Sequence, residues 1–103
     1  MKNFIYILIM KHPKEIENYN GTIQECAKDI AKMDYSSQVE FLNYYYQELK
    51  RQAEGDKNRP SIKDPSKTRT QLAEGLEKTA LSLFNVKENM IKLVRICKPY
   101  MKE

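Results

Sequence analysis

The amino-acid sequence predicts an all-α protein, a small antiparallel bundle of three helices with an apolar N-terminal arm. Apolar residues recur at steps of three and four along three stretches of the chain, which is the spacing of one helix face. Only three glycines and four prolines interrupt the 103 residues. With 41% hydrophobic and 31% charged residues, the composition suits a folded chain, and its length fits a single helical domain over residues 1–103.

The predicted arm covers residues 1–13. It contains the run Phe4–Met10, "FIYILIM", which is too short to cross a bilayer because a spanning helix needs about 20 apolar residues. No small-residue cleavage site follows the run, which argues against a signal peptide. The sequence leaves open whether the arm is a strand, a helix or irregular. Because a short bundle buries such a run poorly, we predict a homo-oligomer that self-associates through Phe4, Ile5, Ile7 and Ile9.

The first helix is predicted from Thr22 to Met33. Asn20-Gly21 is a turn signal just before it. Thr22 and Glu25 match the capping-box pattern, in which each side chain accepts a hydrogen bond from the other residue's backbone N–H. The apolar residues that follow keep the helical spacing, so the helix is placed directly after the turn.

The second helix is predicted to begin at Ser37 and to stop at Gly55. Ser37 and Glu40 form another capping-box pattern, and glycine is the commonest residue just past a helix end. One face of this helix carries the apolar side chains Val39, Leu42, Tyr46, Leu49 and Ala53.

A basic linker that contains two prolines, residues 55–66, is predicted to separate the second helix from the third. The third helix is expected to begin near Lys67, with Asp64 or Ser66 as its cap. It should end or bend at Pro99, because proline lacks the backbone N–H that a helix interior needs.

The third helix contains one candidate break. Asn85 and Glu88 have the spacing of a further capping box, and a break near Asn85 would give four helices rather than three. We favour a single long helix, since its apolar stripe continues through this point.

Three consecutive tyrosines lie in the middle of the second helix. A helix turns by about 100° per residue, so these neighbours cannot share one face. Tyr46 falls in the centre of the apolar face, Tyr45 at its edge and Tyr44 almost opposite. Phe41 lies one turn before Tyr45. Because tyrosine is enriched at protein interfaces, we interpret Phe41, Tyr44 and Tyr45 as a partner-binding patch.

The net charge of +4 comes from one segment of the chain. Residues 50–70 hold seven basic and three acidic residues, whereas the remainder holds 11 of each. A basic loop can neutralise the phosphates of a nucleic acid. The alternative function is therefore a nucleic-acid-binding accessory protein that uses Lys57, Arg59, Lys63, Lys67 and Arg69.

Motifs for common catalytic chemistry are missing from the sequence. There is no GxGxxG, P-loop, HExxH or GxSxG pattern. The one histidine, His12, and the two cysteines, Cys26 and Cys97, lack the spacing of a metal site. We therefore expect no enzyme activity, no catalytic residue, no cofactor and no metal.

These observations favour a protein that acts by binding. Free cysteines without a disulfide pattern are typical of a reducing compartment, so we expect a cytoplasmic protein, and we expect no membrane partner. The predicted function is a non-enzymatic protein–protein interaction module, such as a small adaptor, inhibitor or regulatory subunit. Its predicted partners are another protein and further copies of itself.

Overall fold

The computed structural model describes residues 13–100, which contain helices and no strand. The all-α prediction is therefore confirmed. The arm residues Phe4, Ile5, Ile7 and Ile9 lie outside the described residues, so the self-association predicted for them stays a prediction. The described elements are α2 (Ile23–Lys32), α3 (Tyr35–Asp56), α4 (Thr70–Cys97) and the short 3₁₀ helix η1 (Lys98–Tyr100).

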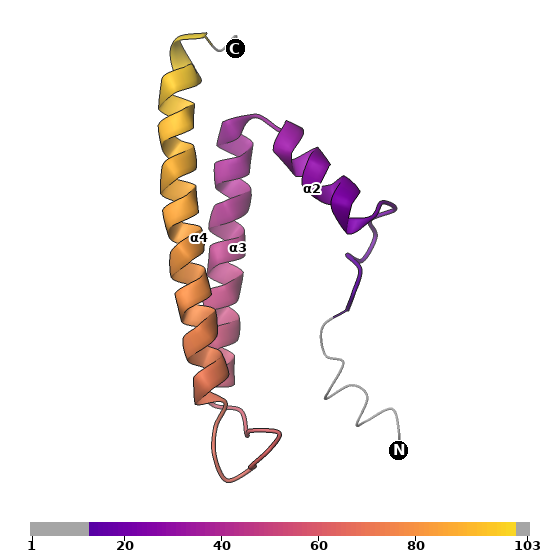
Figure 1. The fold of residues 1–103 in the computed structure, drawn as a ribbon, viewed down its shortest axis with the longest axis vertical. Helices are drawn as coiled ribbons and strands as arrows, with labels where there is room; N and C mark the ends of the chain where they lie inside the picture. Colours follow the sequence, from indigo (N-terminus) through magenta and orange to yellow (C-terminus); the bar gives the residue numbers. More distant parts are fainter. Residues whose placement is uncertain (1–12, 101–103) are drawn as a thin grey trace. The chain divides into compact units, whose positions relative to one another are not determined.

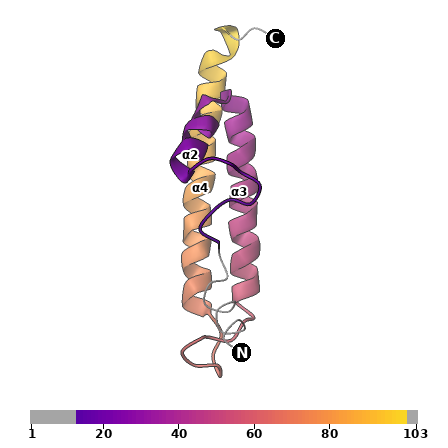
Figure 2. The same ribbon diagram turned by 90° about the vertical axis from the view of Figure 1, so that its right-hand side faces the viewer.

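The chain divides into two compact units between Lys32 and Met33. In the second unit α3 and α4 lie side by side and run antiparallel, joined at one end by the loop 57–69 (Figures 1 and 2). The longer helix, α4, has 28 residues against 22 in α3 and projects past the start of α3 (Figure 1). We call this antiparallel pair the hairpin. The prediction of a single domain is not tested by this division.

The predicted capping box at the start of α2 is confirmed. The Glu25 N–H donates to the Thr22 hydroxyl over 3.1 Å, and the Thr22 N–H donates to the Glu25 carboxylate, also over 3.1 Å. Two backbone donors that the helix itself cannot satisfy are thereby paired. The helix starts one residue after the predicted position and ends one residue before it.

A side-chain hydrogen bond ties the turn before α2 to the helix. The Tyr19 hydroxyl donates to the Asp29 carboxylate over 2.6 Å. This bond requires the phenol to keep its proton, and together with the nearby negative charge it raises the pKa of Tyr19 to about 12. The tie is therefore complete below pH 10, the ordinary tyrosine pKa, and is lost as pH rises through 12.

The predicted ends of α3 were wrong. Asp34, not Ser37, is the N-cap, because the Ser37 N–H donates to the Asp34 carboxylate over 2.7 Å. This hydrogen bond stabilises the ionised carboxylate and lowers the pKa of Asp34. At the other end Gly55 does not stop the helix: Lys57 keeps a right-handed helical conformation and its N–H still bonds the Ala53 carbonyl. The linker therefore begins at residue 57 rather than 55.

The start of α4 also differs from the prediction. The helix begins at Thr70, three residues after Lys67, and Arg69 precedes it without a side-chain cap. Asp64 does not cap it because its carboxylate is used within the loop, where it accepts hydrogen bonds from the backbone N–H and the hydroxyl of Ser66. That pairing also lowers the pKa of Asp64.

The helix α4 is unbroken. It runs through Asn85 and Glu88 without interruption, so the four-helix alternative is wrong and the preferred long helix is confirmed. It ends at Cys97, two residues before Pro99, as the sequence predicts.

Three alanines form the contact line between the two helices. Ala53, Ala73 and Ala80 are each at most 1% exposed, whereas Leu49 is 8% exposed. Among residues 13–100 these four are the buried apolar side chains. A methyl group lets two helices approach closely, but it contributes little apolar area. We call this line the alanine seam.

The seam predicts opposite effects for two substitutions in α4. Ala80→Leu should destabilise the chain by about 1–3 kcal/mol, because the tight contact has no room for three more carbon atoms. Gly75→Ala should stabilise it by about 0.5–1 kcal/mol, since a Cβ atom there meets nothing within 4 Å. Urea unfolding at one fixed protein concentration measures both. Equal stability of the leucine variant and the natural chain would contradict the seam.

Candidate functional site

Two side-chain contacts set the register of the hairpin. The rings of Tyr46 and Phe84 lie 5.5 Å apart, centroid to centroid, and are tilted by 55°. One turn away the Lys87 ammonium group donates to the Asn43 side-chain oxygen over 3.3 Å and lies 4.4 Å from the centre of the Phe84 ring. These contacts also fix how each helix is rotated, so the remaining side chains can be assigned to one side of the hairpin or the other.

One side of the hairpin is polar. We give each side chain an angle around its helix axis, measured from the seam alanine of that helix. Lys50 of α3 and Glu77 of α4 lie at about 60°, and Glu54 and Leu81 lie at about 100° in the same direction. All four line one open depression, which shows that these flanks of α3 and α4 share a side. Charges there are paired across the helices: the Lys57 ammonium group lies 2.6 Å from the Glu77 carboxylate. That hydrogen bond raises the pKa of Lys57.

The opposite side of the hairpin is apolar. Tyr45 and Met90 lie about 80°, and Phe41 and Val86 about 120°, from the seam in the other rotational sense. The register places Tyr45 level with Val86, and Phe41 level with Met90, along the hairpin axis. We call this surface the apolar flank; its residues are Phe41 and Tyr45 from α3 and Leu83, Val86, Met90 and Leu93 from α4.

The apolar flank is open to solvent. Phe41 is 40% exposed, and Tyr45 and Val86 are each 46% exposed. Leu93 is also exposed, while Leu83 and Met90 are half-buried. The Phe41 and Tyr45 rings contact each other at 6.1 Å between centroids and so form one aromatic surface. A patch of this kind on a small protein is typical of a binding site.

The α4 half of this surface carries no charge. It consists of uncharged residues at helical spacing, which are Leu72, Gly75, Thr79, Leu83, Val86, Met90, Leu93 and Cys97. The Thr79 hydroxyl donates to the Gly75 carbonyl of its own helix over 2.8 Å. Its donor is therefore already used, so a partner of this stripe would make apolar contacts with it rather than hydrogen bonds.

The structure brings together two members of the predicted aromatic patch and separates the third. Phe41 and Tyr45 share the apolar flank, whereas Tyr44 is 61% exposed and lies about 180° from the seam. The exposures of Tyr44, Tyr45 and Tyr46 decrease in that order, as the helical positions predicted.

Sequence reasoning missed the contribution of α4. Val86 and Met90 belong to the apolar stripe that was assigned to the core of the third helix. The available signal was the width of this stripe, since leucines at 72, 83 and 93 and Val86 broaden it beyond what one neighbouring helix can cover.

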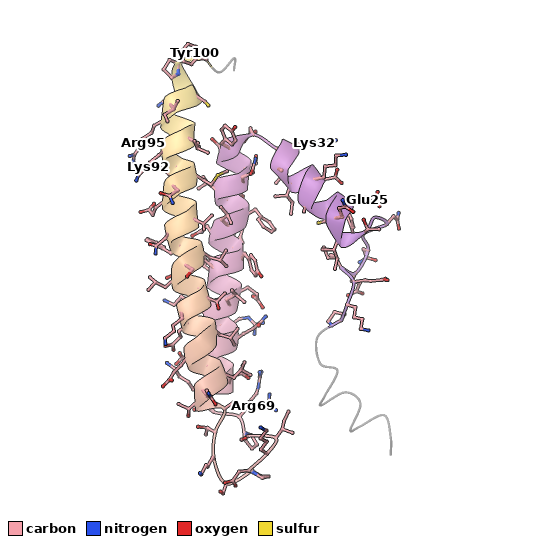
Figure 3. The ribbon with its side chains drawn as sticks, in the orientation of Figure 1. Glu25, Lys32, Arg69, Lys92, Arg95 and Tyr100 are labelled. Atoms are coloured by element: carbon pink, nitrogen blue, oxygen red, sulfur yellow. The ribbon has the colours of Figure 1, made fainter. Side chains whose placement is uncertain are left out.

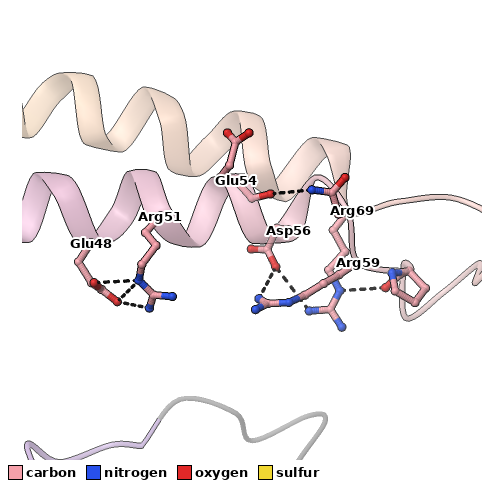
Figure 4. Close-up of polar contacts among 8 residues, drawn as sticks. Glu48, Arg51, Glu54, Asp56, Arg59 and Arg69 are labelled. Carbon is pink, nitrogen blue, oxygen red and sulfur yellow. Dashed lines mark hydrogen bonds and ion pairs between the residues drawn. The ribbon is translucent and has the colours of Figure 1, made fainter.

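The basic loop is built around one buried carboxylate (Figure 4). Asp56, which is 5% exposed, lies 3.1 Å from the Arg59 guanidinium group and 3.7 Å from that of Arg69. Arg69 also donates from Nε to the Pro60 carbonyl over 2.9 Å. Two arginines that the sequence assigned to nucleic-acid binding therefore hold the ends of the loop together. Figure 3 shows Arg69 at this end of the hairpin.

Two of the three remaining basic residues of that set are also paired. Lys57 contacts Glu54 at 3.6 Å as well as Glu77, and Lys67 lies 4.0 Å from Asp64. Lys63 makes no ion pair within residues 13–100. The acidic partners reduce the charge that the loop presents to a polyanion.

The described residues show no arrangement for metal chemistry or for crossing a membrane. Within residues 13–100 no three His, Cys, Asp or Glu side chains gather in a group that could hold a metal ion. No helix in that range has both the length and the apolar character that a bilayer requires. Comparison with protein-family models, curated proteins and solved structures found no match to this chain.

The loop contacts predict the effect of removing the buried carboxylate. Asp56→Ala should destabilise the chain by about 2 kcal/mol, because Arg59 and Arg69 lose their common acceptor in a partly buried site. Glu48→Ala is the matched control, since it removes an i,i+3 partner of Arg51 on the exposed surface and should change stability little. Urea unfolding checks both. A loss no larger than that of the control would contradict the structural role of Asp56.

Proposed function

We propose that this chain is a non-enzymatic protein–protein interaction module, such as a small adaptor, inhibitor or regulatory subunit, and that it binds through the apolar flank. The observation that carries the proposal is the exposure of that flank beside a core of one leucine and three alanines. A cytoplasmic location is part of the proposal; Cys26 and Cys97 are free thiols, which suits a reducing compartment.

The hairpin leaves apolar area in water that a partner can bury. Burying apolar surface is favourable by roughly 25 cal/mol per Å², and aromatic side chains such as Phe41 and Tyr45 bury about 150–250 Å² each. A helix in a two-helix hairpin has one neighbour, so only a narrow stripe of each helix can be covered. A partner that covers the apolar flank therefore gains binding free energy without first unfolding or rearranging the hairpin.

The charges of the loop favour this proposal over the nucleic-acid alternative. Four of the five basic residues predicted to contact phosphates have an acidic partner. A nucleic acid would have to compete with carboxylates for Arg59 and Arg69, and Asp56 is held between them. The alternative predicts binding at low salt that weakens steeply as salt rises and when Lys63 is neutralised.

Capture experiments with full-length chain from its source cell test the proposal. The double variant Tyr45→Glu, Val86→Glu places two carboxylates on the apolar flank and should abolish capture of partners, because an unpaired charge is costly to bury. Leu81→Glu is the matched control: this leucine is 60% exposed on the polar side of the same helix pair, so its variant should keep all partners.

Circular dichroism should show the same helix content in both variants, since the substituted side chains are exposed. Partners that are retained by the double variant, or lost equally from the control, would refute binding through the apolar flank. Capture of nucleic acid alone, released by salt, would support the alternative function instead.

A further inference from the structure

We infer that the apolar flank is the contact surface of a homodimer, in which a second copy of this chain packs its own flank face to face to complete a four-helix arrangement. This inference rests on the proposed function, since it names the partner of the same surface. The three observations that identify the partner are the charge of the flank, its size and the geometry of the hairpin.

The charge of the flank favours a neutral, apolar partner. None of the α4 residues on this face, at positions 72, 75, 79, 83, 86, 90, 93 and 97, is charged. On the α3 side the nearest charges are Glu48 and Arg51, which form an ion pair with each other (Figure 4). A strongly acidic or basic partner would find no complementary charge here. A second copy presents the same uncharged surface, and no unpaired like charges meet when the two flanks approach.

The side of the hairpin that carries the flank is large enough for a specific dimer. The 22 residues of α3 span about 33 Å, and two adjacent helices are about 20 Å wide, which gives a footprint of about 660 Å². Side chains make the accessible area of such a surface larger than its projection. Stable interfaces bury about 800 Å² on each partner, so this whole side of the hairpin is close to the standard size, and the flank is its apolar part.

The geometry of the hairpin suits a two-fold axis that lies in the interface. A symmetric dimer uses the same surface on both copies, and the flank extends along both helices at the same level. Rotation by 180° would place each helix against a helix of the other copy. Each helix would then have two neighbours around a shared core, as in a four-helix bundle, and Phe41, Tyr45, Val86 and Met90 would lie in that core.

Analytical ultracentrifugation of the purified full-length chain tests this inference, over a concentration range from about 1 µM to about 200 µM. The natural chain is expected to be a dimer over the upper part of this range. Val86→Glu should raise the dimer dissociation constant by about a hundredfold or more, because each dimer would bury two unpaired carboxylates. The control Leu81→Glu should leave the dissociation constant within about twofold, because it lies on the polar side.

A second measurement locates the contact without changing its polarity. In a background with Cys26→Ser and Cys97→Ser, oxidised mixtures of Val86→Cys and Tyr45→Cys chains should form disulfide-linked dimers, whereas Leu81→Cys chains should not. A dimer in which only the Leu81→Cys chains cross-link would place the contact on the other side and overturn the inference.

The outcomes separate this inference from the proposed function. A monomer at every concentration overturns the homodimer. If the flank variants still lose another captured protein, the interaction module stands and its partner is a different chain. If the natural chain is a monomer and the flank variants are less stable than it, the chain's own residues cover the flank. That result overturns the inference and the proposed function together.

Discussion

The close approach of α3 and α4 along the alanine seam is the constraint from which the rest of the hairpin follows. Ala53, Ala73 and Ala80 leave almost no space between the helices. A contact made of methyl groups is tight, but it buries little apolar area, so the large apolar side chains lie beside the seam rather than in it. Farther from the loop 57–69, the rings of Tyr46 and Phe84, which are much larger than alanine, continue the contact between the helices.

This arrangement gives the hairpin two different sides. On one side Lys57, directly after α3, forms an ion pair with Glu77 of α4, and further charged residues line the same open depression. On the other side Phe41, Tyr45, Val86 and Met90 form a surface with few polar groups to satisfy. Exposed apolar patches of this kind favour association, and this is the side on which we propose that a partner binds.

Much of this architecture could be predicted from local signals. The capping box of Thr22 and Glu25, the stop before Pro99 and the order of exposure of Tyr44, Tyr45 and Tyr46 each depend on residues within a turn or two of one another. The wrong predictions also have local causes. Asp34 caps the helix three residues earlier than predicted, because its carboxylate, a strong acceptor, accepts the hydrogen bond of the Ser37 N–H.

What the sequence could not provide is the pairing of distant residues. Asp56 had no feature that marked it as the acceptor for both Arg59 and Arg69, since that role depends on how the loop returns to α4. The apolar flank likewise needs the register between α3 and α4, which two long-range contacts of Tyr46 and Lys87 define. Either helix alone shows a wide apolar face; only the hairpin shows which part of it stays uncovered.

Hydrogen exchange of the backbone amides of α3 and α4, measured at several protein concentrations, tests most directly whether a second chain completes this thin core. If the flank is buried in a dimer, the slowest amides open only when the two chains separate. Protection should then increase by about threefold for each tenfold increase in concentration, the square-root dependence of a dimer that unfolds to monomers. Protection that is independent of concentration would contradict the account.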